Sequence, residues 1–159
     1  MAKKILKNLL IVSSLFIMVV FIGCGNNGHS EDAPVEATMT INPTEIKISD
    51  GTPPPAPPTT HREEYQIVVK DGNGIPLKNV ELRITFWLAV PDVYGVVQFI
   101  DGDTPVNSPL KATTDEDGSY ILKLDFLSGN GLTYSGGIEV TSGSLYESAD
   151  FEVDAGDAA

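Results

Sequence analysis

The chain has 159 residues with 10 basic and 22 acidic side chains, which gives a net charge of −12. This acidity argues against nucleic-acid binding, because Lys and Arg must neutralise the phosphates, and against charge-driven attachment to an anionic lipid surface. The chain contains one cysteine, so no disulfide can form within it and a folded domain must be held by its apolar core.

Residues 1–23 have the pattern of a secretory signal peptide. Lys3, Lys4 and Lys7 precede an almost unbroken apolar run from Leu9 to Ile22. That run has 14 residues, fewer than the roughly 20 that a permanent membrane-spanning helix needs. We therefore expect a signal helix that is cleaved before residue 24. Removing 23 of 159 residues leaves 136, with 7 basic against 22 acidic side chains and a net charge of −15.

The stretch Phe21-Ile22-Gly23-Cys24 resembles the lipobox of bacterial lipoproteins. The resemblance implies diacylglycerol on the Cys24 sulfur, a further acyl chain such as palmitate on the new amino terminus, and stable membrane attachment by two or three chains. Gly25 follows the cysteine, which by the same resemblance favours the outer membrane in a Gram-negative host. The alternative is a buried or reactive thiol in an ordinary signal-anchored protein.

Three segments lack the apolar periodicity of regular structure. Residues 24–37 are polar and rich in turn-forming residues, so we expect a flexible tether. Residues 52–60 form a proline-rich insertion in which five residues lack an amide N–H, which predicts an extended polyproline II spacer or, alternatively, a docking site for a proline-reading module. Residues 155–159 are expected to be a disordered tail.

The region between these segments alternates apolar and polar residues with a period of two. Met39–Ile48 predicts a short edge strand broken at Pro43. The clearest later strands are Tyr65–Val69, Val80–Phe86, Tyr120–Phe126, Ile138–Val140 and Ala149–Val153. Turn signals rich in Asp, Asn and Gly separate them. We therefore predict an all-β fold, a single antiparallel immunoglobulin-like β-sandwich of seven to eight strands over residues 38–154.

Two segments resemble bacterial immunoglobulin-like domains of the invasin/intimin type. Val69–Val80 is similar to their D-x-x-G-x-P-x-x-x-V hairpin, and Ala112–Tyr120 is similar to their T-x-x-T-D-x-x-G segment. Gly74 suits a turn with positive φ, and Asp115 is able to accept hydrogen bonds from its own turn. The resemblance implies the sandwich fold and a role in cell adhesion or envelope structure.

No arrangement for catalysis stands out. The two histidines, His29 and His61, both lie in segments expected to be flexible, so no ordered nucleophile, base and orienting group can be drawn. We expect no enzymatic activity and no cofactor beyond the lipid on Cys24.

Calcium is the one metal that the residue types suit. Asp101, Asp103, Asp115 and Asp117 carry hard oxygen ligands in turns that could converge at one end of a sandwich. The alternative is that these are ordinary acidic turns.

The candidate partner-binding residues are Trp87, Leu88, Val90 and Tyr94. They form an aromatic-rich segment without the alternation of the strands, and Trp and Tyr are enriched where interfaces gain binding energy. Alternatively, Trp87 continues the Phe86 strand and plugs the sandwich end.

These features together predict a non-enzymatic envelope lipoprotein that engages another envelope protein or a surface polymer. One alternative is a calcium-stiffened adhesive or spacer module. Another is an accessory subunit of an extracytoplasmic enzyme. This alternative predicts a pair of carboxylates in a cleft, whereas the leading hypothesis predicts carboxylates scattered over turns.

Overall fold

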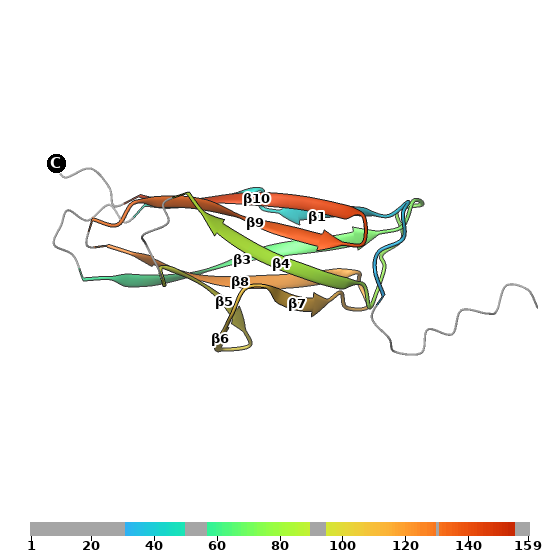
Figure 1. The fold of residues 1–159 in the computed structure, drawn as a ribbon, viewed down its shortest axis with the longest axis horizontal. Coiled ribbons are helices and arrows are strands. Elements are labelled where there is room, and N and C mark those ends of the chain that lie inside the picture. The colour runs from blue at the N-terminus through green and yellow to red at the C-terminus, as the bar shows by residue number, and fades with distance from the viewer. Residues whose placement is uncertain (1–30, 50–56, 90–94, 130, 155–159) are drawn as a thin grey trace, which may run out of the picture.

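Two five-stranded sheets pack face to face in the computed structural model, which describes residues 31–49, 57–89, 95–129 and 131–154. The strands are β1 (Thr38–Asn42), β2 (Glu45–Ser49), β3 (Thr59–Lys70), β4 (Glu81–Leu88), β5 (Val97–Asp101), β6 (Thr104–Val106), β7 (Leu110–Thr113), β8 (Ser119–Ser128), β9 (Tyr134–Ser142) and β10 (Leu145–Asp154). One sheet has the order β1-β3-β8-β5-β6 and the other β2-β10-β9-β4-β7. Figure 1 shows β10, β9 and β4 in one layer and β3, β8 and β5 in the other.

The predicted all-β immunoglobulin-like sandwich is confirmed, with ten strands in the described residues rather than seven or eight. The additional strands include β6 and β7, which have three and four residues and are too short to show a period of two. The signal helix, Cys24, residues 52–56 of the insertion and the tail 155–159 lie outside the described residues. Among the described residues, no helix is long and apolar enough to cross a bilayer.

The core forms where the inward-facing residues of the two sheets meet. The alternation read from the sequence places one face of each strand inside, as expected for half-buried strands. The largest fully buried side chains are Tyr65, Phe99, Phe126, Phe151, Ile67, Leu82, Ile84, Leu122, Leu124, Ile138, Val69 and Val140. Phe126 and Phe151 meet edge to face across the two sheets, with ring centroids 5.0 Å apart.

The first predicted strand divides at Pro43 into two edge strands of different sheets. β1 pairs antiparallel with β3, whereas β2 pairs parallel with β10. The edge positions are as predicted, but the wholly antiparallel pairing is not, because the chain changes sheets without reversing direction. The β2–β10 pair is the one parallel pairing among the strands of the described chain.

The strand β3 begins earlier than the alternation indicates. Thr59 and Thr60, assigned to the proline-rich insertion, already pair with β8. The polar part of β3 is held by Arg62, whose guanidinium donates to both carboxylate oxygens of its cross-strand neighbour Asp125 at 2.7 and 3.0 Å. Cross-strand pairs of opposite charge stabilise such a sheet without any apolar pattern.

Residues 31–37, expected as part of the flexible tether, instead pack on the sandwich. The amide of Glu31 donates to the Asn79 carbonyl at 3.1 Å, and its own carbonyl accepts from Glu81 at 2.8 Å. The Ala33 amide donates to the buried Ser142 hydroxyl at 3.0 Å. Ala33 and Ala37 are both buried in the core. The packed domain therefore includes residues 31–37.

Two buried tyrosines connect the sheets by hydrogen bonds. The Tyr65 hydroxyl on β3 donates to the Asp150 carbonyl on β10 at 2.7 Å. The Tyr134 hydroxyl on β9 lies 2.9 Å from the Leu127 carbonyl and 3.1 Å from the Val96 carbonyl in the opposite sheet. Burial raises the pKa of both phenols above the ordinary value of 10.0, so both are neutral donors at physiological pH.

We expect Tyr65→Phe to lower the free energy of unfolding by about 1 to 2 kcal/mol, because it removes a buried hydrogen bond between the sheets. Urea unfolding followed by circular dichroism measures this change. Tyr146→Phe is the control, since the Tyr146 side chain is 56% exposed and its loss should cost less than about 0.5 kcal/mol. Equal effects of the two substitutions would contradict the prediction.

The same hydroxyl predicts a pH dependence. Because the folded state raises the pKa of Tyr65, its contribution to stability is complete below pH 10 and is lost as the pH rises above that value. The wild-type protein should therefore lose stability above pH 10, and Tyr65→Phe should lose it less steeply. Parallel declines in the two proteins would show that Tyr65 is not responsible.

Candidate functional site

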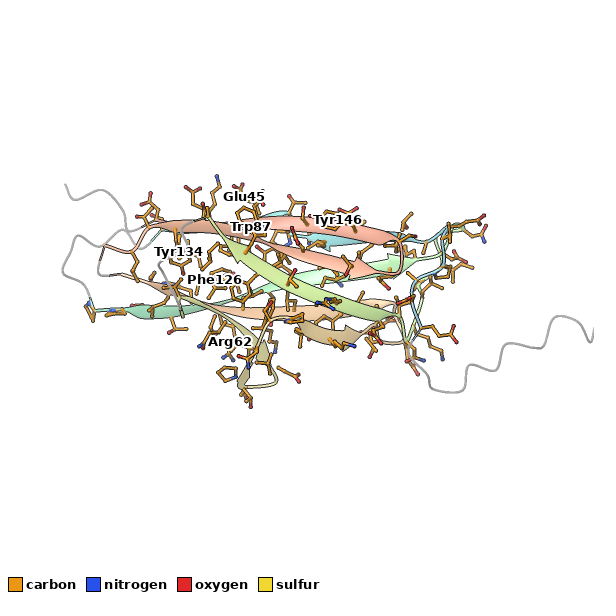
Figure 2. All side chains as sticks on the ribbon, in the orientation of Figure 1. Glu45, Arg62, Trp87, Phe126, Tyr134 and Tyr146 are labelled. Atoms are coloured by element: carbon orange, nitrogen blue, oxygen red, sulfur yellow. The ribbon has the colours of Figure 1, made fainter. Side chains whose placement is uncertain are left out.

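Four residues form a row across the outer face of the second sheet. Glu45 on β2 is in register with Asp150 on β10, Asp150 with Gly137 on β9, and Gly137 with Trp87 on β4. Figure 2 shows Glu45 and Trp87 on this layer, with Arg62 on the opposite side of the sandwich. The row brings residues from β2, β4, β9 and β10 together.

Trp87 continues the Phe86 strand, as one of the two alternatives expected, but it does not plug the sandwich end. Phe86 points inward, where its ring meets the buried Phe99 edge to face at 5.1 Å. The next residue in a strand faces the other way, and Trp87 is accordingly 46% exposed on the outer face. Leu88 packs against the core. Val90 and Tyr94 lie outside the described residues.

Two consecutive glycines on β9 shape the surface beside the indole. A Cβ on Gly137 would lie 3.0 Å from the Trp87 Nε1 atom and 3.1 Å from an Asp150 carboxylate oxygen. The missing side chain therefore gives the indole room over β9. On the inner face, a Cβ on Gly136 would overlap the Trp87 carbonyl oxygen and the Phe151 ring. This pair was not among the candidates predicted from the sequence, although glycines inside a strand pattern signal close approach of neighbouring groups.

A surface hollow of about 330 Å³ opens next to the indole. It is lined by Glu45, Trp87, Ser135, Gly136, Asp150, Phe151 and Glu152. We call this feature the Trp87 hollow. Its volume lies at the lower end of the range of sites that hold a small molecule, about 300 to 1,000 Å³.

The Trp87 hollow is electronegative. Three of its lining residues are the carboxylates Glu45, Asp150 and Glu152. Lys47 lies beside them, with its Nζ 3.1 Å from Glu45 and 3.8 Å from Glu152. The hydrogen bond that Lys47 donates to Glu45, together with the negative charges of Glu45 and Glu152, raises the pKa of Lys47 above its usual value. Asp150 forms no ion pair with any described residue, so the surroundings keep an excess of negative charge.

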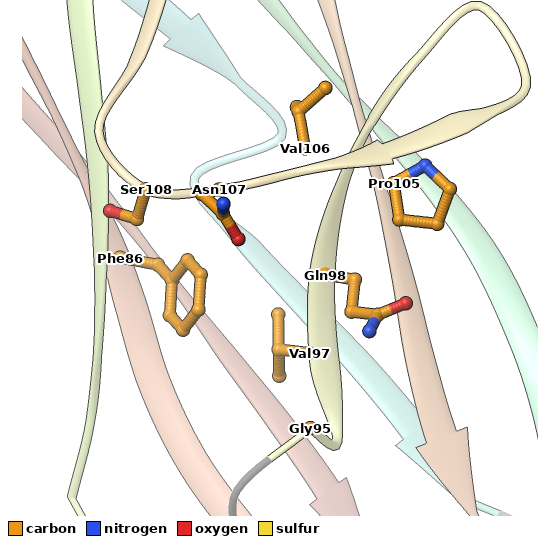
Figure 3. Close-up of a pocket in the computed structure, with 8 residues that line it drawn as sticks. All are labelled: Phe86, Gly95, Val97, Gln98, Pro105, Val106, Asn107 and Ser108. Carbon is orange, nitrogen blue, oxygen red and sulfur yellow. The ribbon is translucent and has the colours of Figure 1, made fainter.

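A second hollow lies between β4 and the β5–β6 hairpin. Its volume is about 180 Å³, and Figure 3 shows that Phe86 and Val97 lie against it. The other residues that line it are Gly95, Gln98, Pro105, Val106, Asn107 and Ser108. Among the described residues no titratable side chain lines this hollow, so they supply no group for acid–base chemistry.

The four calcium candidates are not gathered into one site. Both carboxylate oxygens of Asp115 are used within its own turn: one accepts from the amides of Asp117 and Ser119 at 2.9 and 2.8 Å, and the other from the Ser119 hydroxyl at 2.9 Å. These bonds, with the Ser119 amide contributing most, lower the pKa of Asp115. Asp103 accepts from Arg62 at 3.2 Å. Within the described ranges, no three His, Cys, Asp or Glu residues are grouped so that they could hold a metal ion.

His61, expected in a flexible segment, lies on β3 and contacts Ser128 of β8. Its Nε2 atom is 2.8 Å from the Ser128 hydroxyl, which also donates to the Thr59 carbonyl at 3.5 Å. A histidine and serine at this distance could form a nucleophile and base. However, Ser128 is fully buried, so a substrate cannot reach its hydroxyl. The contact joins the ends of β3 and β8.

No protein-family model and no curated protein matches the chain. Among solved structures, a C. elegans member of the MSP family, WR4, is similar with a TM-score of 0.40 and 9% sequence identity, over 74% of this chain and 96% of that one. A PapD-like (ASH) domain of human CEP192, domain 7, is similar with a TM-score of 0.43 and 10% identity, over 87% of this chain and 99% of that one. Likenesses this distant transfer no function.

We expect alanine substitutions at the two glycines of β9 to have different effects. Gly136→Ala should lower the free energy of unfolding by more than about 2 kcal/mol, because its Cβ meets backbone and a packed ring. Gly137→Ala should cost less, on the order of 1 kcal/mol, because its Cβ meets the Ala149 carbonyl oxygen and the Trp87 Nε1 atom at 3.0 Å, contacts that small shifts relieve, and because the unfolded chain loses freedom. It should also shift the emission of Trp87, the one tryptophan of the chain.

Urea unfolding and fluorescence spectra measure both effects. A larger loss of stability for Gly137→Ala than for Gly136→Ala would contradict the assignment of outer and inner faces.

Proposed function

We propose that this chain is a non-enzymatic lipoprotein of a bacterial cell envelope whose sandwich binds another protein through the Trp87 hollow. The sandwich itself is compatible with a binding or structural module. The lipid anchor, the envelope location and the protein partner are parts of the proposal that do not follow from the fold.

The exposed indole beside a hollow is the observation that carries the binding role. A tryptophan that is 46% exposed leaves a large apolar surface in water, and tryptophan is among the residues that contribute most binding energy at protein interfaces. Here it lies on a regular sheet, where β9 and β10 hold it in place. A rigid support lowers the ordering cost of binding, so this surface suits docking of a partner.

The proposed anchor rests on the sequence before the domain. Cys24 follows the small residue Gly23 and an apolar run, as in the lipobox, and Gly25 favours sorting to the outer membrane of a Gram-negative host. The packed domain already includes Glu31. Only a short stretch of chain would then separate it from the lipid, so we propose that the domain is held close to the membrane surface.

The described residues support a role without catalysis. The histidine–serine contact on β3 and β8 is closed to substrate because Ser128 is buried. In the Trp87 hollow, the side chains of Glu45 and Glu152 are half exposed, at 51% and 52%. Neither carboxyl group is shielded from water, whereas the carboxyl of an acid catalyst is commonly enclosed by apolar side chains.

One observation favours a second candidate, an accessory carbohydrate-binding subunit of an extracytoplasmic enzyme. Three carboxylates gather around a hollow with a tryptophan wall, instead of being scattered over turns as the leading hypothesis expected. Aromatic rings and carboxylates are able to contact a sugar face and its hydroxyls. Titration with neutral oligosaccharides separates this candidate from a protein partner.

The anchor is tested by Cys24→Ala in the native host. The substitution should leave an unprocessed precursor that is poorly retained by membranes, because neither lipidation nor cleavage before residue 24 can follow. Immunoblotting of membrane and soluble fractions measures both the size and the location. Normal processing with full membrane retention would contradict the lipoprotein assignment.

The partner surface is tested by photo-crosslinking in intact cells. A photoreactive amino acid in place of Ser135, which lines the Trp87 hollow, should yield an adduct of discrete mass with another envelope protein. The matched control replaces Ile121, which is 42% exposed on β8 in the other sheet. No discrete adduct at Ser135, or the same adduct at both positions, would contradict the proposed surface.

A further inference from the structure

We propose that the Trp87 hollow recognises a basic side chain of the partner protein, an arginine in preference to a lysine. This inference rests on the proposed function, because it specifies the chemistry of the partner that the same surface binds. Three features of the hollow support it: its aromatic wall, its charge and its shape.

The aromatic wall and a carboxylate lie side by side. The Trp87 Nε1 atom and an Asp150 carboxylate oxygen both lie within about 3 Å of the point where a Cβ of Gly137 would be. The absence of a side chain at Gly137 thus brings an indole and a carboxylate over the same part of β9. A guanidinium is able to stack on an aromatic ring and pair with a carboxylate at the same time.

The negative charge around the hollow exceeds the positive charge near it, which favours binding of a further cation. Glu45, Asp150 and Glu152 carry three negative charges, and the ammonium of Lys47 lies near Glu45 and Glu152. Asp150 is without an ion pair among the described residues. A cation entering beside Trp87 would therefore meet a carboxylate that no internal cation neutralises, and the net charge of −12 would attract basic partners from a distance.

The shape favours a planar group at the end of an apolar stem. The hollow of about 330 Å³ is lined by the exposed Trp87, by Ser135 and by the carboxylates Glu45, Asp150 and Glu152, whereas the Phe151 ring beside it is buried in the core. The methylene stem of an arginine is able to cover apolar atoms while its guanidinium reaches the carboxylates. A lysine offers a compact, strongly hydrated charge that stacks less well on an indole.

The test uses Trp87 as its own reporter, since the chain contains one tryptophan. The full-length protein in nonionic detergent is titrated with capped Gly-Arg-Gly, and with matching peptides that carry lysine or citrulline. Citrulline has nearly the shape of arginine without its charge. We expect saturable changes in Trp87 emission with dissociation constants on the order of 1 mM for arginine, weaker binding of lysine, and about tenfold weaker or absent binding of citrulline.

Matched variants locate the binding. Asp150→Asn should weaken arginine binding about fivefold or more, whereas Glu147→Gln should change it less than about twofold. Glu147 is an exposed carboxylate of the same strand that does not line the hollow. The NMR signals of the Gly136 and Gly137 backbone amides give a second measure of peptide binding. This measure also works for Trp87→Phe, which has lost the tryptophan fluorescence.

The outcomes separate this inference from the proposed function. Equal binding of arginine and citrulline, equal effects of the two carboxylate variants, or preferential binding of a neutral oligosaccharide would overturn recognition of a basic side chain. If no arginine binding is detected while the Ser135 crosslink forms, this inference fails and the partner surface stands. If arginine binds as expected but no crosslink forms, the hollow has the stated chemistry and the proposed protein partner is wrong.

Discussion

The hydrogen bond from the Tyr65 hydroxyl to the Asp150 carbonyl joins the interior of the sandwich to its candidate site. It crosses from β3 to β10 with a length of 2.7 Å. The residue that accepts it through its backbone, Asp150, also lines the Trp87 hollow. β10 also pairs with β2 and β9 on its two sides. Because all three interactions converge on one stretch of β10, the position of the Asp150 carboxylate depends on the packing of both sheets.

Alternation in the sequence was sufficient for the core and the general architecture. A residue such as Leu82 or Leu124 lies inside because its neighbours on the strand are polar and the period of a strand is two. The same rule placed Phe86 inside and Trp87 outside once β4 was known to continue through both residues. Alternation of apolar and polar residues is a property of each strand by itself, which explains why a single sequence shows it.

The features that the sequence did not reveal depend on partners distant in the chain. The parallel pairing of β2 with β10 joins residues about a hundred positions apart, and nothing in the pattern of β2 distinguishes it from an antiparallel strand. Residues 31–37 pack through backbone bonds and two alanines, which carry no periodic signal. His61 belongs to a strand because its backbone pairs with β8, in register with Phe126, and the neighbouring ion pair of Arg62 with Asp125 joins the same two strands. The hollow requires Gly137 and Trp87 to be neighbours across two strands.

The bridge between Glu31 and Val80 has a consequence for how the domain would be presented. It holds the start of the described chain beside the first residues of β4, whereas Trp87 lies near the other end of that strand. At the usual rise of a strand, the six residue steps from Glu81 to Trp87 correspond to roughly 20 Å. If the chain is anchored through its N-terminal side, β4 would act as a rigid spacer between the lipid headgroups and the indole. Trp87 would then be accessible to a molecule that approaches from the aqueous side.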